Sequence, residues 1–284
     1  MTTAPPPIAA RTRLGVVSYL NTLPLIAGLE SLESIELDHA VPSALIDRLL
    51  RGEVDLALCS VADYVKSPEP LRMAPVGMLG CEGATMTVRL YSRVPIARVT
   101  TVHADTDSHT SVILLQVLLR ERFGRAVEMI DFDTRSGDGT DAEGSKPESL
   151  LLIGDKVVVA APDHREYPYQ LDLGEAWLES TGLPFVFAVW MCRARGDDAL
   201  ERRLRTAAAA LDHQRRHNRT RIPSIVHRHA IARGWPKFDA DRYLDSMLKY
   251  EIGPREIEGL ETFFRLAHRH GLLPAPRPLA FLEG

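Results

Sequence analysis

At the start of its folded region the chain reads Leu14-Gly15-Val16-Val17-Ser18-Tyr19-Leu20-Asn21-Thr22-Leu23-Pro24. The apolar run predicts a strand, and the small polar residues and proline that follow predict a turn into a helix. Ser18, Asn21 and Thr22 carry hydrogen-bonding groups without charge. Ligands of α/β proteins usually lie at the carboxyl ends of strands. The turn is therefore either part of a ligand site or an ordinary helix cap.

The segments after this turn alternate between strand and helix patterns. Residues 35–41 alternate apolar with polar side chains, and residues 42–50 repeat apolar side chains at helical spacing. Residues 54–59 form a nearly continuous apolar run that ends on Ser60, as in buried parallel strands. This β-α-β-α-β order predicts an open α/β sheet with parallel strands. The glycine-rich motifs of nucleotide sites are missing from the sequence, so we expect no nucleotide cofactor.

A second cluster of uncharged polar residues precedes a strongly predicted helix. Ser108-His109-Thr110-Ser111 comes directly before the apolar helical pattern of residues 112–123. Backbone amides at a helix start favour an anion such as a carboxylate, although an ordinary capped helix explains the same residues. Further along, an apolar run ends on Gly154-Asp155, residues 185–191 read as a central buried strand, and the chain from 197 onward is predicted to be helical.

The composition is that of a soluble globular protein and excludes several partners. Hydrophobic residues make up 45% of the 284 residues, and the formal net charge is -4. The arginine-rich stretch 193–233 has no Phe, Tyr or Trp to stack on bases, which favours a solvated helix face over a nucleic-acid site. Three cysteines indicate free thiols in a reducing compartment. Without a membrane-length apolar run or a signal-peptide pattern, we expect a cytoplasmic protein with no membrane partner.

Pairs of histidines in the predicted C-terminal helices raise the question of a metal site. Their neighbours are mainly arginines, which repel a cation, and no His-Glu-x-x-His motif is present. We therefore expect no metal at the pairs His213/His217, His227/His229 and His268/His270.

Five blocks in the same order resemble the chorismate dehydratase family of the futalosine route to menaquinone. They cover nearly the whole chain: Ser18-Tyr19-Leu20-Asn21-Thr22-Leu23-Pro24, Ser108-His109-Thr110-Ser111, Leu152-Ile153-Gly154-Asp155, Asp172-Leu173-Gly174-Glu175-Ala176-Trp177 and Thr181-Gly182-Leu183-Pro184-Phe185-Val186-Phe187-Ala188-Val189-Trp190. His109 stands where that family commonly has arginine, and Thr87 stands where it usually has serine.

The resemblance implies a type II periplasmic-binding-protein-like fold, with two α/β lobes around a cleft and a helical C-terminal extension. Residues 1–10 would be a disordered tail. The first lobe would comprise residues 11–92 together with 191–284. The second lobe would comprise residues 93–190, with a flexible insertion at 134–149.

The reaction implied by the resemblance is the loss of water from chorismate to give 3-[(1-carboxyvinyl)oxy]benzoate. No cofactor is needed, because formation of the aromatic ring supplies the driving force. The oligomeric state is open, with a homodimer as one option. Two alternatives remain: the sister enzyme 1,4-dihydroxy-6-naphthoate synthase, whose opening motif this chain lacks, and a non-catalytic protein that binds small carboxylates.

Site residues follow from the same resemblance. We expect Ser108, His109, Thr110 and Ser111 to anchor a carboxylate, and Asp155 to contact the ring hydroxyl or shape the second lobe's site. The general base is either the enolpyruvyl carboxylate of the substrate or the His109 imidazole. The residues expected to orient the ring, stabilise developing charge or line the substrate are Ser18, Tyr19, Asn21, Thr22, Ser60, Thr87 and Gly154.

Overall fold

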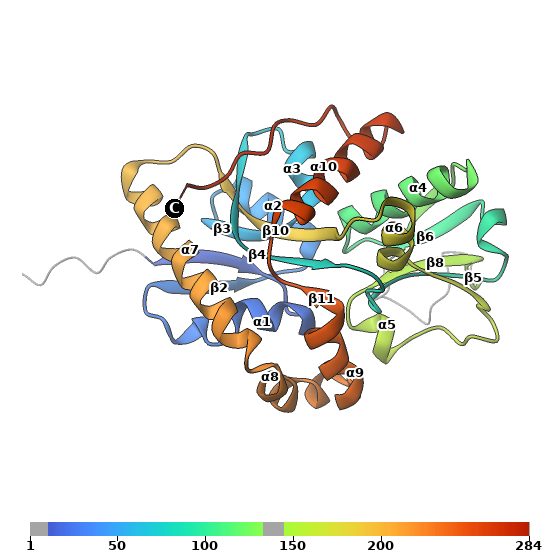
Figure 1. The fold of residues 1–284 in the computed structure, drawn as a ribbon, viewed down its shortest axis with the longest axis horizontal. Coiled ribbons are helices and arrows are strands. Elements are labelled where there is room, and N and C mark those ends of the chain that lie inside the picture. The colour runs from blue at the N-terminus through green and yellow to red at the C-terminus, as the bar shows by residue number, and fades with distance from the viewer. Residues whose placement is uncertain (1–10, 133–144, 284) are drawn as a thin grey trace, which may run out of the picture.

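A computed structural model describes residues 11–132 and 145–283 of the chain. The expected tail, 1–10, lies outside the described residues, as does most of the expected insertion at 134–149. The chain forms two α/β lobes that lie side by side (Figure 1). This architecture agrees with the fold expected from the sequence.

The first lobe is built on a six-stranded sheet with the order β11-β4-β10-β3-β1-β2. The β1 strand pairs in parallel with β2 and β3, which confirms the predicted parallel opening. The strands are β1 (Thr12–Val16), β2 (Ile35–His39), β3 (Leu56–Ser60), β4 (Leu71–Cys81), β10 (Phe185–Arg193) and β11 (Leu248–Lys249). The two-residue β11 corrects the expectation that the chain is entirely helical after residue 197.

The second lobe is built on a five-stranded sheet with the order β7-β6-β8-β5-β9. Its strands are β5 (Val88–Ser92), β6 (Thr101–Asp105), β7 (Glu128–Phe132), β8 (Ser149–Ile153) and β9 (Tyr169–Asp172).

The lobe boundaries differ from those expected at both crossovers. Residues 88–92 belong to the second sheet because β5 pairs with β8 and β9. Residues 185–190 belong to the first sheet because β10 pairs with β3 and β4. Strand pairing decides these boundaries, and an apolar run next to a crossover carries no mark of its partner.

Two antiparallel strands, β4 and β10, bring the chain out of the first lobe and back into it. The strands approach so closely that a Cβ atom at Gly80 would lie 2.6 Å from the Phe185 carbonyl oxygen. Glycine is therefore required at this point of the crossover.

Helices cover both sheets and continue past the last long strand. They are α1 (Leu23–Ile26), α2 (Pro42–Leu50), α3 (Val61–Lys66), α4 (His109–Phe123), α5 (Lys156–Val159), α6 (Leu173–Thr181), α7 (Asp198–Arg219), α8 (Ile222–His229), α9 (Lys237–Arg242) and α10 (Pro254–Arg269). A π-helical turn, Tyr243–Met247, follows α9. None of the helices in the described ranges has both the length and the apolar character needed to cross a membrane.

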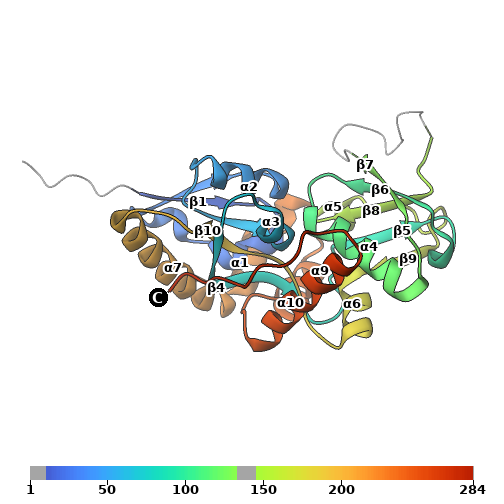
Figure 2. The same ribbon diagram turned by 90° about the horizontal axis from the view of Figure 1, so that it is seen from above.

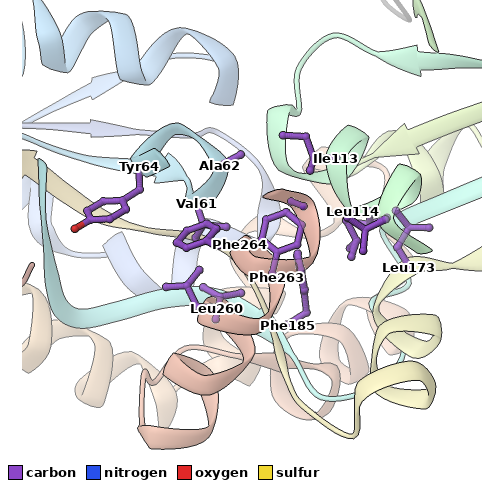
Figure 3. Packing of buried hydrophobic residues seen from close by; sticks show 14 of the residues in the cluster. Val61, Ala62, Tyr64, Ile113, Leu114, Leu173, Phe185, Leu260, Phe263 and Phe264 are labelled. Atoms are coloured by element: carbon purple, nitrogen blue, oxygen red, sulfur yellow. The ribbon is translucent and has the colours of Figure 1, made fainter. Parts of the chain in front are cut away.

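The main hydrophobic core is shared between the two lobes. Figure 2 shows α10 at their junction, and Figure 3 shows its aromatic side chains packed between α3 and α4. The rings of Phe263 and Phe185 lie 5.1 Å apart at an edge-to-face angle, and Phe264 stacks parallel to Tyr64. The three cysteines are free and buried, which confirms the expectation of free thiols.

Candidate active site

A pocket opens between the two sheets beside the crossing strands, with about 670 Å³ of space that includes its open mouth. Residues of both lobes line it, as do residues of β10 and of the π-helical turn. They are Val17, Tyr19, Asn21, Pro42, Leu58, Ser60, Leu79, Thr85, Thr87, Val88, Ser108, Ser111, Ile153, Gly154, Phe187, Ala188, Tyr243 and Leu248. Seven of the residues expected from the sequence therefore lie together in the pocket: Tyr19, Asn21, Ser60, Thr87, Ser108, Ser111 and Gly154.

None of these lining residues, all within the described part of the chain, is acidic or basic. The polar groups are aliphatic hydroxyls, the Asn21 amide and the phenols of Tyr19 and Tyr243. Burial raises the pKa of both phenols, so both are protonated at neutral pH. The walls can therefore donate hydrogen bonds to a ligand, but they offer no side chain suited to remove a proton.

The three polar groups of Asn21, Tyr243 and Thr87 form one hydrogen-bonded chain. The Asn21 amide donates from Nδ2 to the Tyr243 hydroxyl at 3.2 Å. The Tyr243 and Thr87 hydroxyl oxygens lie 2.6 Å apart. These hydrogen bonds thus link the first lobe to the second through Tyr243, a residue of the C-terminal helical region.

Besides Thr85, whose hydroxyl donates to Asp172, Tyr243 is the polar residue of the pocket lining that the sequence did not predict. It begins the π-helical turn, it is 1% exposed, and its ring stacks on Trp235 at a centroid distance of 5.0 Å. Single π-helical turns occur often at functional sites. The sequence around Tyr243 shows only a helical pattern, so nothing in it distinguishes this tyrosine from one in the core.

Ser108 and Ser111 reach the pocket from the start of α4. The Ser108 hydroxyl accepts from the Ser111 backbone amide at 3.1 Å and donates to the Ser111 hydroxyl at 2.8 Å. Ser108 is thus an N-cap, as predicted if the motif forms an ordinary capped helix. Both side chains also line the pocket, so the cap geometry leaves the predicted ligand role open to them.

Tyr19 spans the cleft and closes one side of the pocket. Its hydroxyl donates to Asp107 Oδ2 of the second lobe at 3.1 Å. Its ring lies against the backbone of Gly154, where an added Cβ would come within 3.1 Å of the ring. Gly154 also has a positive φ of 72°, which favours glycine at this strand end for a second reason.

Two expected residues near the opening motif lie outside the pocket lining. Ser18 is exposed, and its hydroxyl lies 3.2 Å from His39 Nδ1. Thr22 is fully buried and donates to Asn21 Oδ1 at 3.2 Å. Thr22 therefore orients the Asn21 amide and does not reach the ligand space.

Three expected residues of the second lobe lie outside the pocket lining and form hydrogen bonds to the first lobe: Asp155, His109 and Thr110. The Asp155 carboxylate accepts from the Leu20 backbone amide at 3.3 Å, and burial raises its pKa. His109 Nδ1 lies 2.7 Å from Asp63 Oδ1. This hydrogen bond raises the pKa of His109, while burial acts in the opposite direction. Thr110 accepts from the Ala62 backbone amide at 3.2 Å.

A family model described as menaquinone biosynthesis matches residues 12–269, which is most of the chain. The chain belongs to this menaquinone biosynthesis family. It is also 31% identical over 264 residues to a chorismate dehydratase of Thermus thermophilus, covering 88% of this chain and 93% of that protein.

Solved structures of solute-binding proteins share the fold of this family member. An alkanesulfonate-binding protein of Xanthomonas axonopodis matches with a TM-score of 0.64 and 12% identity, over 93% of this chain and 94% of that one. A periplasmic aliphatic sulphonate-binding protein of Escherichia coli matches with a TM-score of 0.63 and 15% identity, over the same shares of the two chains. The periplasmic-binding-protein-like architecture is thereby established, and the identities are too low to carry function.

Proposed function

We propose that this protein is a chorismate dehydratase, a cytoplasmic hydro-lyase that converts chorismate to 3-[(1-carboxyvinyl)oxy]benzoate and water at the start of the futalosine route to menaquinone. The observation that carries the proposal is the likeness to the Thermus enzyme, which extends over 88% of this chain and includes both lobes. The uncharged, donor-rich pocket between the lobes supports it, because the reaction needs hydrogen-bond donors but no cofactor.

The reaction breaks two bonds of the substrate ring. The C3–H bond gives its electron pair to a new ring double bond, and the C4–O bond breaks as the hydroxyl leaves. The base passes the proton taken from C3 to the leaving oxygen, which departs as water, and the ring becomes aromatic. An enzyme must therefore hold the two carboxylates, receive the C3 proton and stabilise charge on the C4 oxygen.

Asn21 and Thr87 are the groups we assign to the C4 oxygen. Both line the pocket, and each has a hydrogen that its partners within the protein leave for a ligand. Ser108 and Ser111, at the start of the 15-residue helix α4, would hold a carboxylate with the help of the helix dipole. Ser60 and Tyr19 would complete the wall around the ring.

The base in this proposal is the substrate's own enolpyruvyl carboxylate. The described pocket walls contain no carboxylate, imidazole or amine, and the two phenols stay protonated. His109, the alternative base, is hydrogen-bonded to Asp63 through Nδ1 and does not line the pocket. We assign to His109, Thr110 and Asp155 the holding of the two lobes in the arrangement that encloses the substrate.

Incubation of the purified protein with chorismate tests the proposal. We expect an aromatic ultraviolet spectrum to develop and a product lighter than chorismate by one water to appear in mass spectra. Asn21→Ala, purified in the same way, is the control for contaminating activity. Tight binding of chorismate without conversion would instead identify a carboxylate-binding protein. Turnover of cyclic dehypoxanthinyl futalosine, with none of chorismate, would identify the sister enzyme.

A further inference from the structure

The buried hydroxyl of Tyr243 connects the two polar groups that the proposed function places at the leaving oxygen. It accepts from Asn21 Nδ2 at 3.2 Å and lies 2.6 Å from Thr87 Oγ1. The side chain comes from neither lobe's sheet but from the C-terminal π-helical turn.

The phenol hydrogen of Tyr243 decides which groups donate in the hydrogen bonds that link Asn21, Tyr243 and Thr87. A buried hydroxyl hydrogen needs an acceptor. Among the described residues, the bonds of Tyr243 are those to Asn21 and Thr87, and Asn21 is the donor in the first of them. With its hydrogen donated to Thr87, the Tyr243 hydroxyl is satisfied within the protein, and the Thr87 hydroxyl keeps its own hydrogen for a further partner.

The orientation of the Asn21 side chain also leaves a donor for the pocket. Thr22 donates to Oδ1 of Asn21 at 3.2 Å, so the amide nitrogen is the atom that faces Tyr243. An amide nitrogen carries two hydrogens. One is used by Tyr243, and the second remains available to the pocket that Asn21 lines.

We propose that Tyr243 is a positioning residue that turns Asn21 and Thr87 into two converging donors for one acceptor oxygen of the substrate. The inference rests on the proposed function, in which that acceptor is the leaving C4 hydroxyl oxygen. Donors fixed in place before the reaction stabilise developing negative charge without reorganisation. Tyr243 is itself fixed, because it is 1% exposed and its ring stacks on Trp235.

The test is Tyr243→Phe, which keeps the stacked ring and removes one oxygen. We expect kcat for chorismate to fall by about 10- to 100-fold, less than the 10²–10³ lost when a preorganised donor is removed outright, while KM changes by less than about threefold. Tyr250→Phe is the matched control, since Tyr250 is 5% exposed and its hydroxyl has no partner among the described residues. That variant should keep the wild-type kcat.

A second pair of variants separates positioning from a purely structural role. Thr87→Val with Tyr243→Phe replaces both partners of the 2.6 Å bond by apolar groups of similar shape, so this double variant leaves no unpaired hydroxyl between them even if the single variant unfolds. We expect Tyr243→Phe to lower kcat much less in the Thr87→Val background than in the wild type. A merely structural tyrosine would lower kcat equally in both.

The outcomes distinguish this inference from the proposed function. Wild-type protein that neither converts nor binds chorismate removes the proposed function and this inference with it. Active wild type with an equally active Tyr243→Phe overturns the inference alone. So does an equal loss in both Thr87 backgrounds, or a loss that appears only as a raised KM. A fall in kcat that depends on Thr87 supports it.

Discussion

The Tyr19 hydroxyl of the first lobe donates to Asp107 Oδ2 of the second lobe at 3.1 Å, and Tyr19 also lines the pocket between the lobes. Asp107 Oδ2 also lies 3.4 Å from Lys156 Nζ, and the carboxylate is 3% exposed at the residue level. The Tyr19 hydroxyl therefore donates to a buried carboxylate that is paired with a lysine. This hydrogen bond links the segment 18–24 to the second lobe.

Tyr19→Phe should weaken this tie without disturbing the pocket wall, because the ring stays against Gly154. A hydrogen bond to a charged group contributes about 1.5–3 kcal/mol, so we expect KM for chorismate to rise by roughly tenfold or more with a smaller change in kcat. Steady-state kinetics on chorismate give the answer. An unchanged KM would show that the Asp107 bond does not contribute to enclosing the substrate.

Gly154→Ala should damage both the strand end and the pocket. Its positive φ costs about 1–2 kcal/mol for a residue with a Cβ, and that Cβ would press on the Tyr19 ring from 3.1 Å. Gly182→Ala is the matched control, since Gly182 has a φ of 71° with nothing within 4 Å of its would-be Cβ. Both variants should melt at a lower temperature, and Gly154→Ala alone should lose turnover. Equal activity of the two would show that the Tyr19–Gly154 contact is not needed.

The fold was predictable from the sequence where side-chain pattern and backbone pairing carry the same information. The buried run of residues 54–59 ending on Ser60 indicates a parallel strand and a polar tip, and both are present in β3. The pattern does not reveal which strands pair, so the sequence does not show that residues 88–92 join the second sheet and residues 185–190 the first. The sequence does not predict Tyr243 as a site residue for the same reason. Its position next to Asn21 and Thr87 depends on how a helical segment distant in sequence packs.

The stability conferred by His109 should depend on pH. Its hydrogen bond to Asp63 raises the pKa of the folded imidazole above the ordinary value of 6.5. The stabilisation is therefore complete below about pH 6.5 and is lost as the pH rises through the raised pKa of the folded state. Denaturant unfolding between pH 5.5 and 8.5 should show this loss in the wild type and a flatter profile in His109→Gln.

His164→Gln controls for the removal of a histidine elsewhere, because its side chain is 80% exposed. It should leave the pH profile of unfolding unchanged. Near-normal kcat in His109→Gln would agree with the assignment of the base to the substrate carboxylate. A loss of several orders of magnitude in kcat, with normal folding, would instead return His109 to the role of base.

Asn21→Ala and Asn21→Asp test whether donation from the amide is what the reaction requires. Removing one preorganised donor from a developing oxyanion costs about 10²–10³ in kcat, so we expect a loss of that size for Asn21→Ala with normal folding. Asn21→Asp keeps the shape, but an ionised carboxylate donates no hydrogen bond and repels a dianionic substrate. Its kcat should fall at least as far as that of Asn21→Ala, and its KM should rise. Recovery of activity in Asn21→Asp relative to Asn21→Ala would mean that position 21 accepts a proton or hydrogen bond, against the donor direction set by Thr22 and Tyr243.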